Sequence, residues 1–246
     1  MPRLQAVDSS FPHAMPIADS IAKVVARLEG APGAGARWLR GYGMSKVRMD
    51  QLYPAALSLI PPGDRVLDLG CGIGLLGLLL EARGLCNETL GIEWDPAKAQ
   101  FGQRTAEGKV GTRILCGDLF EVPWPPCSVV TVLDVLHYLP AERQRALLFR
   151  IGAHLPEGGR LLLRVMDAQA GGMAILTRLA ERLAVGFGWN LAPRVHWRSL
   201  ADLRIDLADA GFSLRLDPGT RGAMAGNQIL LCIRGPKTRH GTGPSN

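Results

Sequence analysis

A glycine-rich turn carries the clearest chemical signal in the sequence. It reads Asp68-Leu-Gly-Cys-Gly-Ile-Gly74. Residues 65–69 are apolar enough for a buried strand, and residues 75–83 have the composition of a helix. The glycines at 70, 72 and 74 have no Cβ atoms, so a ligand can approach the backbone closely at these positions. The free N–H groups at the start of the helix favour an anionic group such as a carboxylate or a phosphate.

Three interpretations of this turn are open. Gly72, Gly74 and Gly77 match the G-x-G-x-x-G pattern of dinucleotide-binding turns. The stretch 68–74 also resembles motif I of the class I S-adenosylmethionine-dependent methyltransferases, an acidic residue followed by G-x-G-x-G. A tight turn without a ligand is the third interpretation, although it would need only one or two glycines. The cofactor contacts that the resemblance implies are Asp68, toward the methionine ammonium, and Gly70, Cys71, Gly72 and Gly74.

Two further acidic residues end predicted strands. Glu93 ends the strand Thr89–Glu93, about 20 residues after Gly72, which is the spacing that places a carboxylate on ribose hydroxyls. Both NAD and S-adenosylmethionine carry such a ribose, and a strand-end acid can also simply be exposed. Trp94 follows, and we expect it either to stack on the adenine or to cover a helix.

The second acid is Asp118, in Cys116-Gly-Asp-Leu-Phe120 at the end of the third predicted strand. This segment resembles the methyltransferase element that binds adenine through an aspartate and the next backbone N–H. The resemblance implies adenine contacts at Gly117, Asp118 and Leu119, whereas a Gly-Asp turn is also ordinary loop chemistry. Ligands of open α/β sheets bind at the carboxyl ends of the strands, so these acids should meet at one site.

Asp134-Val-Leu-His-Tyr-Leu139 follows the fourth predicted strand, Val129–Leu133. It resembles the fourth motif of small-molecule methyltransferases, which implies that Asp134 contacts the cofactor and Tyr138 the acceptor. It lacks the Asn/Asp-Pro-Pro-Tyr of many amino-directed enzymes. His137 could be the catalytic general base for a hydroxyl acceptor, or it could only line the pocket. Methyl transfer needs mainly positioning and desolvation, so both roles are open.

Composition narrows the class of protein. The 246 residues suffice for one α/β domain, and 47% are hydrophobic. The net charge of +6 is spread along the chain, so we expect no nucleic-acid partner. The five cysteines have no C-x-x-C spacing, which predicts reduced thiols in the cytoplasm and no metal site. We expect no membrane span, because no stretch reaches the roughly 18 apolar residues required.

Strands alternating with helices predict βαβ units and a parallel sheet. Two strands without a helix between them, Phe212–Leu216 and Gln228–Ile233, should form an antiparallel hairpin. The predicted fold is therefore a Rossmann-like α/β fold with a seven-stranded, mostly parallel sheet and helices on both faces. We expect an N-terminal helical cap over residues 1–60, with helical patterns broken near Gly41 and Gly43. A methyltransferase domain over 61–234, a helical insertion at about 170–198 and a disordered tail over 235–246 complete the prediction.

The resemblance implies S-adenosylmethionine as cofactor and methyl transfer, most simply to oxygen, on a small or medium, largely apolar acceptor. We expect the acceptor between the cap, His137, Tyr138 and the insertion, and Arg48 could bind a carboxylate on it. The aromatic and basic side chains expected there are Tyr42, Arg48, Tyr53, Trp189, His196 and Trp197. A second resemblance, to methyltransferases of bacterial aryl-polyene or polyketide-like clusters, rests on Lys46–Asp50, Leu136–Leu139 and Arg164–Asp167.

Two alternatives to methyl transfer come from different classes. A nicotinamide-dependent oxidoreductase of the short-chain type needs Tyr-x-x-x-Lys downstream of the glycine turn, but Tyr42-Gly-Met-Ser-Lys46 lies upstream of it. A protein that binds S-adenosylmethionine without catalysis is the other alternative. The sequence gives no oligomeric state.

Overall fold

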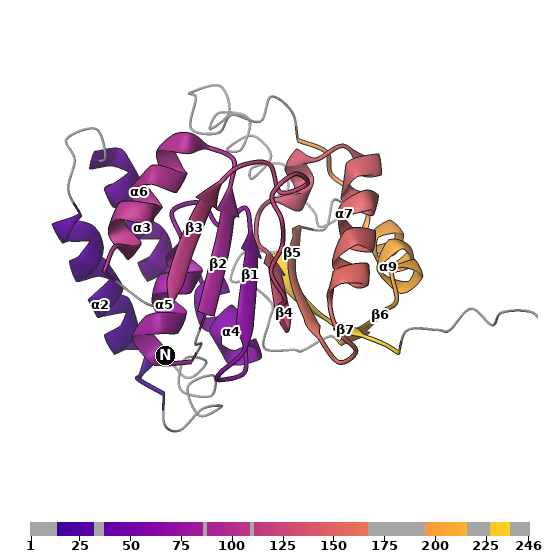
Figure 1. Ribbon diagram of the computed structural model, residues 1–246, viewed down its shortest axis with the longest axis horizontal. Helices are drawn as coiled ribbons and strands as arrows, with labels where there is room; N and C mark the ends of the chain where they lie inside the picture. Colours follow the sequence, from indigo (N-terminus) through magenta and orange to yellow (C-terminus); the bar gives the residue numbers. More distant parts are fainter. Residues whose placement is uncertain are drawn as a thin grey trace, which may run out of the picture.

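A seven-stranded sheet forms the centre of the computed structural model (Figure 1). The structure describes residues 14–31, 37–85, 88–108, 111–166, 195–215 and 227–236. The strands lie in the order β3-β2-β1-β4-β5-β7-β6. Their bounds are β1 (Arg65–Leu69), β2 (Glu88–Glu93), β3 (Thr112–Cys116), β4 (Val129–Val132), β5 (Arg160–Met166), β6 (Phe212–Arg215) and β7 (Asn227–Arg234). The first five are parallel, and β7 pairs antiparallel with both β5 and β6. The predicted fold class, including the terminal antiparallel hairpin, is confirmed.

Helices cover both faces of the sheet (Figure 1). One face carries α2 (Ile17–Gly30), α3 (Arg37–Met49), α4 (Leu52–Leu59), α5 (Leu75–Arg83) and α6 (Pro96–Ala106). The other carries α7 (Ala141–His154) and α9 (Leu200–Asp209). Side chains alternate between the faces along each strand, so Val66 joins the first core and its neighbour Leu67 joins the second.

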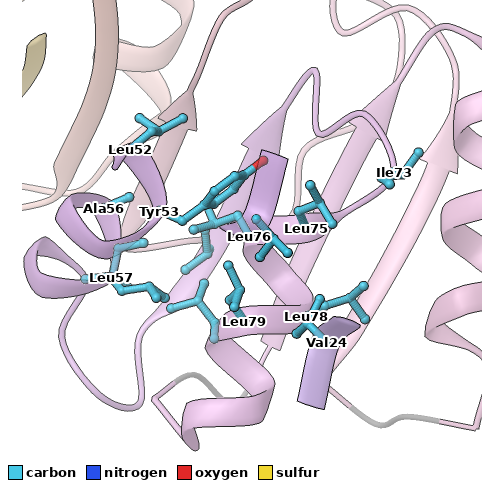
Figure 2. Packing of buried hydrophobic residues seen from close by; sticks show 14 of the residues in the cluster. Val24, Leu52, Tyr53, Ala56, Leu57, Ile73, Leu75, Leu76, Leu78 and Leu79 are labelled. Carbon is cyan, nitrogen blue, oxygen red and sulfur yellow. The ribbon is translucent and has the colours of Figure 1, made fainter. Parts of the chain in front are cut away.

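The N-terminal helices pack on α5 (Figure 2). Leu52, Tyr53 and Leu57 of α4 share one hydrophobic cluster with Leu76 and Leu79 of α5. In Figure 2 the Tyr53 ring lies among these leucines and its hydroxyl oxygen lies at their edge. The division into a cap and a methyltransferase domain stays a prediction, since the two share this core. The insertion at 170–198 and the tail at 235–246 lie almost entirely outside the described residues.

The expected breaks near Gly41 and Gly43 are wrong. Helix α3 is continuous through both glycines and ends at Met49. A Cβ at Gly43 would lie 2.6 Å from Cδ1 of Ile73 and 3.2 Å from Leu28. Gly43 therefore lets α3 approach its neighbours closely, which outweighs its low helix propensity.

The topology of the described sheet creates a natural site for a ligand. Strands β2 and β3 follow β1 on one side of it in the sheet, and β4 lies on the other side of β1. The crossover connections diverge at this switch point, so a crevice opens beyond the ends of β1 and β4. The glycine turn follows β1 and Asp134 follows β4, and both therefore lie at this crevice. No helix in the described ranges is long and apolar enough to cross a membrane.

Candidate functional site

A cavity of about 470 Å³ lies at the switch point. Its volume is within the range of small-molecule and cofactor sites. One side, which we call the carboxylate wall, is formed by the ends of β1, β2 and β3 and includes Asp68, Gly72, Glu93 and Asp118. A second group of lining residues, which we call the aromatic wall, comprises Trp38, Tyr42, Tyr53 and Tyr138. The cavity thus brings together residues from the N-terminal helices and from four strand ends.

The three glycines of the turn have different structural roles. All three have positive φ, at +72° for Gly70, +59° for Gly72 and +78° for Gly74. A Cβ at Gly70 would collide with Val135, and one at Gly74 would lie 2.5 Å from Ile114. A Cβ at Gly72 would meet no atom within 4 Å, although Gly72 lines the cavity. Gly70 and Gly74 are therefore required by packing, whereas Gly72 keeps open a space that a ligand could fill.

Asp68 lies at the end of β1 with only 4% of its surface exposed. The Thr131 hydroxyl donates a hydrogen bond of 2.6 Å to its Oδ1 atom. Burial raises the pKa of Asp68 to about 6, and the nearby Glu93 charge acts in the same direction. Such a carboxylate gains from pairing with a cation, as the expected contact with the methionine ammonium requires.

Glu93 connects the glycine turn to the end of β2. Its Oε2 atom accepts a hydrogen bond of 2.8 Å from the Gly72 N–H, and Oε1 accepts one of 2.9 Å from Asp95. Burial raises the pKa of Glu93, and these backbone donors oppose the shift. Each carboxylate oxygen has two lone pairs, so Glu93 can accept a pair of hydroxyls beside the open space at Gly72.

The expected adenine end also lines the cavity. Gly117, Asp118 and Leu119 all contribute to it, as does Cys71 of the turn. Oδ1 of Asp118 accepts a hydrogen bond of 2.8 Å from the Phe120 N–H, which fixes the loop after β3. Trp94 is 52% exposed and lines the cavity, which leaves its ring available for stacking.

Asp134 occupies a strained position at the end of β4. Its φ is +61°. Among the residues that the structure describes, no other non-glycine residue has a positive φ. Oδ2 accepts a hydrogen bond of 2.9 Å from Lys46 Nζ and one of 3.0 Å from Arg164 Nη1. Burial alone would raise the pKa of Asp134, but these two charges lower it to about 2. Strain of this kind persists where surrounding contacts fix the residue, and it often marks functional sites.

The cavity lining does not include every residue expected at the acceptor site. Tyr42, Tyr53 and Tyr138 line it. Arg48 does not, because it lies on another face of α3, 53% exposed and 3.9 Å from Glu29. Its expected role in binding a carboxylate therefore has no support from the geometry.

His137 also lies outside the lining, in the short helix η2 (Leu136–Tyr138). Its ring stacks on Trp197 with 4.8 Å between centroids and contacts the Tyr138 ring at 4.2 Å. The backbone oxygen of His137 accepts a hydrogen bond from the His196 N–H. His196 and Trp197 thus support η2 and do not line the cavity, and Trp189 lies outside the described residues. The position of His137 favours a supporting role over the expected role as base.

Sequence reasoning missed Lys46 and Trp38 as cavity residues. Both lie on α3, and Trp38, Tyr42 and Lys46 recur every four residues. Such spacing places side chains on one face of a helix, so this signal was available in the sequence. Arg48 is two positions from Lys46, which turns it to another face.

Comparisons with known proteins identify the family. A family model described as a methyltransferase domain matches residues 42–216. A carboxy-S-adenosyl-L-methionine synthase of a Geobacter species is 30% identical over 133 residues, which are 52% of this chain and 53% of that protein. The chain therefore spans about half the length of the curated relatives it matches.

Solved structures share the fold. An O-methyltransferase family 2 protein of Planctomyces limnophilus, in complex with apigenin, aligns with a TM-score of 0.62 at 19% identity, covering 86% of this chain and 65% of that one. Human N-acetylserotonin methyltransferase, in complex with S-adenosylmethionine, aligns with a TM-score of 0.60 at 19% identity, covering 89% and 67%. The family match decides between the two cofactor classes left open by the glycine pattern. The chain belongs to the methyltransferase-domain family, and its fold is the one that these solved methyltransferases share.

Proposed function

We propose that the protein is an S-adenosylmethionine-dependent methyltransferase. It transfers the methyl group to an oxygen of a small or medium, largely apolar acceptor held between the cofactor and the aromatic wall. The observation that carries this proposal is that one cavity is lined by two chemically different groups of residues, the carboxylate wall and the aromatic wall. The carboxylate wall suits the polar groups of the cofactor, and the aromatic wall suits a flat apolar body.

Each residue of the carboxylate wall has a role in holding the cofactor. Asp68 pairs with the ammonium, Glu93 accepts the ribose hydroxyls, and Asp118 with the Leu119 N–H binds the adenine edge. Gly72 leaves the space that the cofactor fills beside them. Bound S-adenosylmethionine supplies a methyl group on a positively charged sulfur. The residues of the cavity place the acceptor in line with that group and exclude water, which accounts for most of the acceleration in such reactions.

Two observations support oxygen as the acceptor atom. The segment after β4 has no Asn/Asp-Pro-Pro-Tyr motif. O-methyltransferases are also among the solved proteins that share the fold, one of them in complex with apigenin.

The test is a turnover assay with defined acceptor classes. The purified protein is incubated with S-adenosylmethionine bearing a ¹³C-labelled methyl group and with panels of phenols, aromatic carboxylic acids and aromatic amines. Release of S-adenosylhomocysteine and a one-methyl mass gain on the acceptor are measured, and NMR locates the label. We expect the label on oxygen.

Other outcomes would contradict the proposal. A label on nitrogen or carbon would exclude O-methylation. Tight binding of S-adenosylhomocysteine without turnover of any acceptor would favour a non-catalytic binding protein. Because the Geobacter relative is named a carboxy-S-adenosyl-L-methionine synthase, the cofactor is also examined by mass spectrometry. A gain of one carboxyl group on the cofactor would show that it is the cofactor that is modified.

A further inference from the structure

Four charged side chains form a cluster at the edge of the cavity, which we call the Lys46 cluster. It consists of Lys46, Asp50, Asp134 and Arg164. Asp134 Oδ2 contacts Lys46 Nζ at 2.9 Å and Arg164 Nη1 at 3.0 Å, and the same Arg164 atom contacts Asp50 Oδ2 at 2.8 Å. The side chains of Lys46 and Arg164 are 23% and 13% exposed. Partly buried ion pairs of this kind are weakly screened by salt, so the cluster fixes its members firmly.

The cluster connects three distant parts of the chain. Lys46 belongs to α3, Asp50 follows it, Asp134 follows β4 and Arg164 belongs to β5. Arg164 donates hydrogen bonds to the carboxylates of both Asp50 and Asp134. Asp134 therefore keeps a cationic partner even when Lys46 binds a further group. Lys46 is therefore the member of the cluster that is free to contact a further group.

Lys46 also reaches the cavity, which it lines together with Asp134. An ammonium has three N–H donors, and Asp134 takes one of them. The Nζ atom lies 5.8 Å from the centre of the Tyr42 ring. A cation next to aromatic side chains is suited to an aromatic ligand that carries an anionic oxygen.

The described lining offers no group suited to take a proton from the acceptor at neutral pH. Asp134 is a very weak base because its pKa is about 2. Its partner Lys46 stays protonated, since Asp134 holds the lysine pKa above its usual value against the effect of burial. Burial holds the pKa of the Tyr53 phenol well above its usual value, so this hydroxyl is no base either. The remaining carboxylates belong to the carboxylate wall, where the cofactor occupies them.

Building on the proposed function, we propose that Lys46 binds an oxygen of the acceptor that is already ionised at neutral pH, on an aromatic body such as an aryl carboxylate or an acidic phenol. The anionic oxygen forms its bond to the methyl carbon with its own electron pair. The carbon–sulfur bond breaks, and its electron pair stays on sulfur, so no proton has to leave. The two positive and two negative charges of the Lys46 cluster sum to zero. The negative charge of the acceptor is therefore left to compensate the positive charge on the sulfur of the bound cofactor.

The test measures binding of two probes that differ in charge and little in shape, benzoate and benzamide. Calorimetric titrations use the full chain saturated with sinefungin, a stable cofactor analogue with a cationic group in place of the sulfonium. We expect benzoate to bind at least tenfold more tightly than benzamide. In Lys46→Met, benzoate should bind about 10- to 100-fold more weakly while benzamide binding is unchanged, as for loss of a charged hydrogen bond. Lys46→Arg should restore much of the preference.

Lys23→Met is the matched control, since it removes the same charge from an exposed position on α2. It should keep the preference for benzoate. Thermal melting and sinefungin affinity show whether each variant is folded. The inference is overturned if the wild type does not prefer benzoate, including the case in which neither probe binds, or if Lys46→Met keeps the preference. Methylation of neutral phenols without any preference for anions would overturn this inference and leave the proposed function intact.

Discussion

Substituting Gly72 with alanine separates binding of the cofactor from stability of the fold. Gly72 has a φ of +59° and a Cβ there would meet no protein atom within 4 Å. The cost to folding is therefore the left-handed backbone alone, about 1–2 kcal/mol. For a chain of this size that corresponds to a fall in Tm of about 2–8 °C.

Gly84 provides the matched control for this strain. It has a φ of +69°, it also has no atom within 4 Å of a built Cβ, and it ends α5 at an exposed position outside the cavity lining. Gly84→Ala should lower the Tm by a similar amount. A methyl group at position 72 additionally occupies space that the cofactor fills, and overpacking of this kind costs about 1–3 kcal/mol. Gly72→Ala should therefore bind S-adenosylhomocysteine about 5- to 150-fold more weakly, and Gly84→Ala should bind it normally.

Calorimetric titration and thermal melting of the two variants give both quantities. If Gly72→Ala binds S-adenosylhomocysteine as tightly as the wild type, the open space is not part of the cofactor site. If both variants lose affinity equally, the loss arises from backbone strain and not from contact with the ligand. Either result would refute the argument from the glycine geometry.

Three further predictions concern Glu93, Asp68 and His137. Glu93→Ala should weaken S-adenosylmethionine by about 1.5–3 kcal/mol in calorimetry, and unchanged affinity would remove Glu93 from the site. The pKa of Asp68 is about 6, so its carboxylate takes up a proton below this pH. The affinity for the cofactor should therefore fall about tenfold from pH 7 to pH 5. Asp68→Asn should bind the cofactor weakly at both pH values. His137→Ala should lower kcat by less than the roughly 10²–10⁴-fold that is typical for loss of a general base. A loss within that range, together with disappearance of the neutral-pH limb of the pH–rate profile, would identify His137 as the base.

The same shift of Asp68 predicts how the stability of the ligand-free protein depends on pH. The native state keeps a proton on Asp68 between about pH 4 and pH 6, where the unfolded chain has lost it. The contribution of Asp68 to the free energy of unfolding is therefore largest below about pH 4 and falls as the pH rises through 6. Asp68→Asn should flatten this part of the curve in denaturant titrations, and an unchanged slope would contradict the assigned shift.

Local patterns in the sequence were sufficient to predict the sheet and the carboxylate wall. The glycine turn, Glu93 and Asp118 each follow a predicted strand directly, and parallel strands bring their carboxyl ends to one edge. The strand β3 and the helix α5 lie where the patterns of apolar residues predicted them. The breaks expected at Gly41 and Gly43 were wrong because a glycine also allows close packing of helices, and packing partners are not visible in a local pattern.

The acceptor side depends on contacts between distant parts of the chain. The Lys46–Asp134 pair spans 88 positions, and the positive φ of Asp134 follows from the contacts around it. No local pattern indicated that His137 would stack on Trp197 and lie outside the cavity lining. The four-residue spacing of Trp38, Tyr42 and Lys46 indicates that they share one face of α3. Only the fold shows that this face lines the cavity.

A crystal structure of the protein with S-adenosylhomocysteine tests the central claim most directly, since that claim is the placement of the cofactor on the carboxylate wall. We predict that the ribose hydroxyls lie within hydrogen-bond distance of Glu93, that the ligand fills the space beside Gly72, and that its ammonium lies at Asp68. The sulfur should face the aromatic wall. A ligand bound elsewhere, or one whose ribose makes no contact with Glu93, would contradict the account.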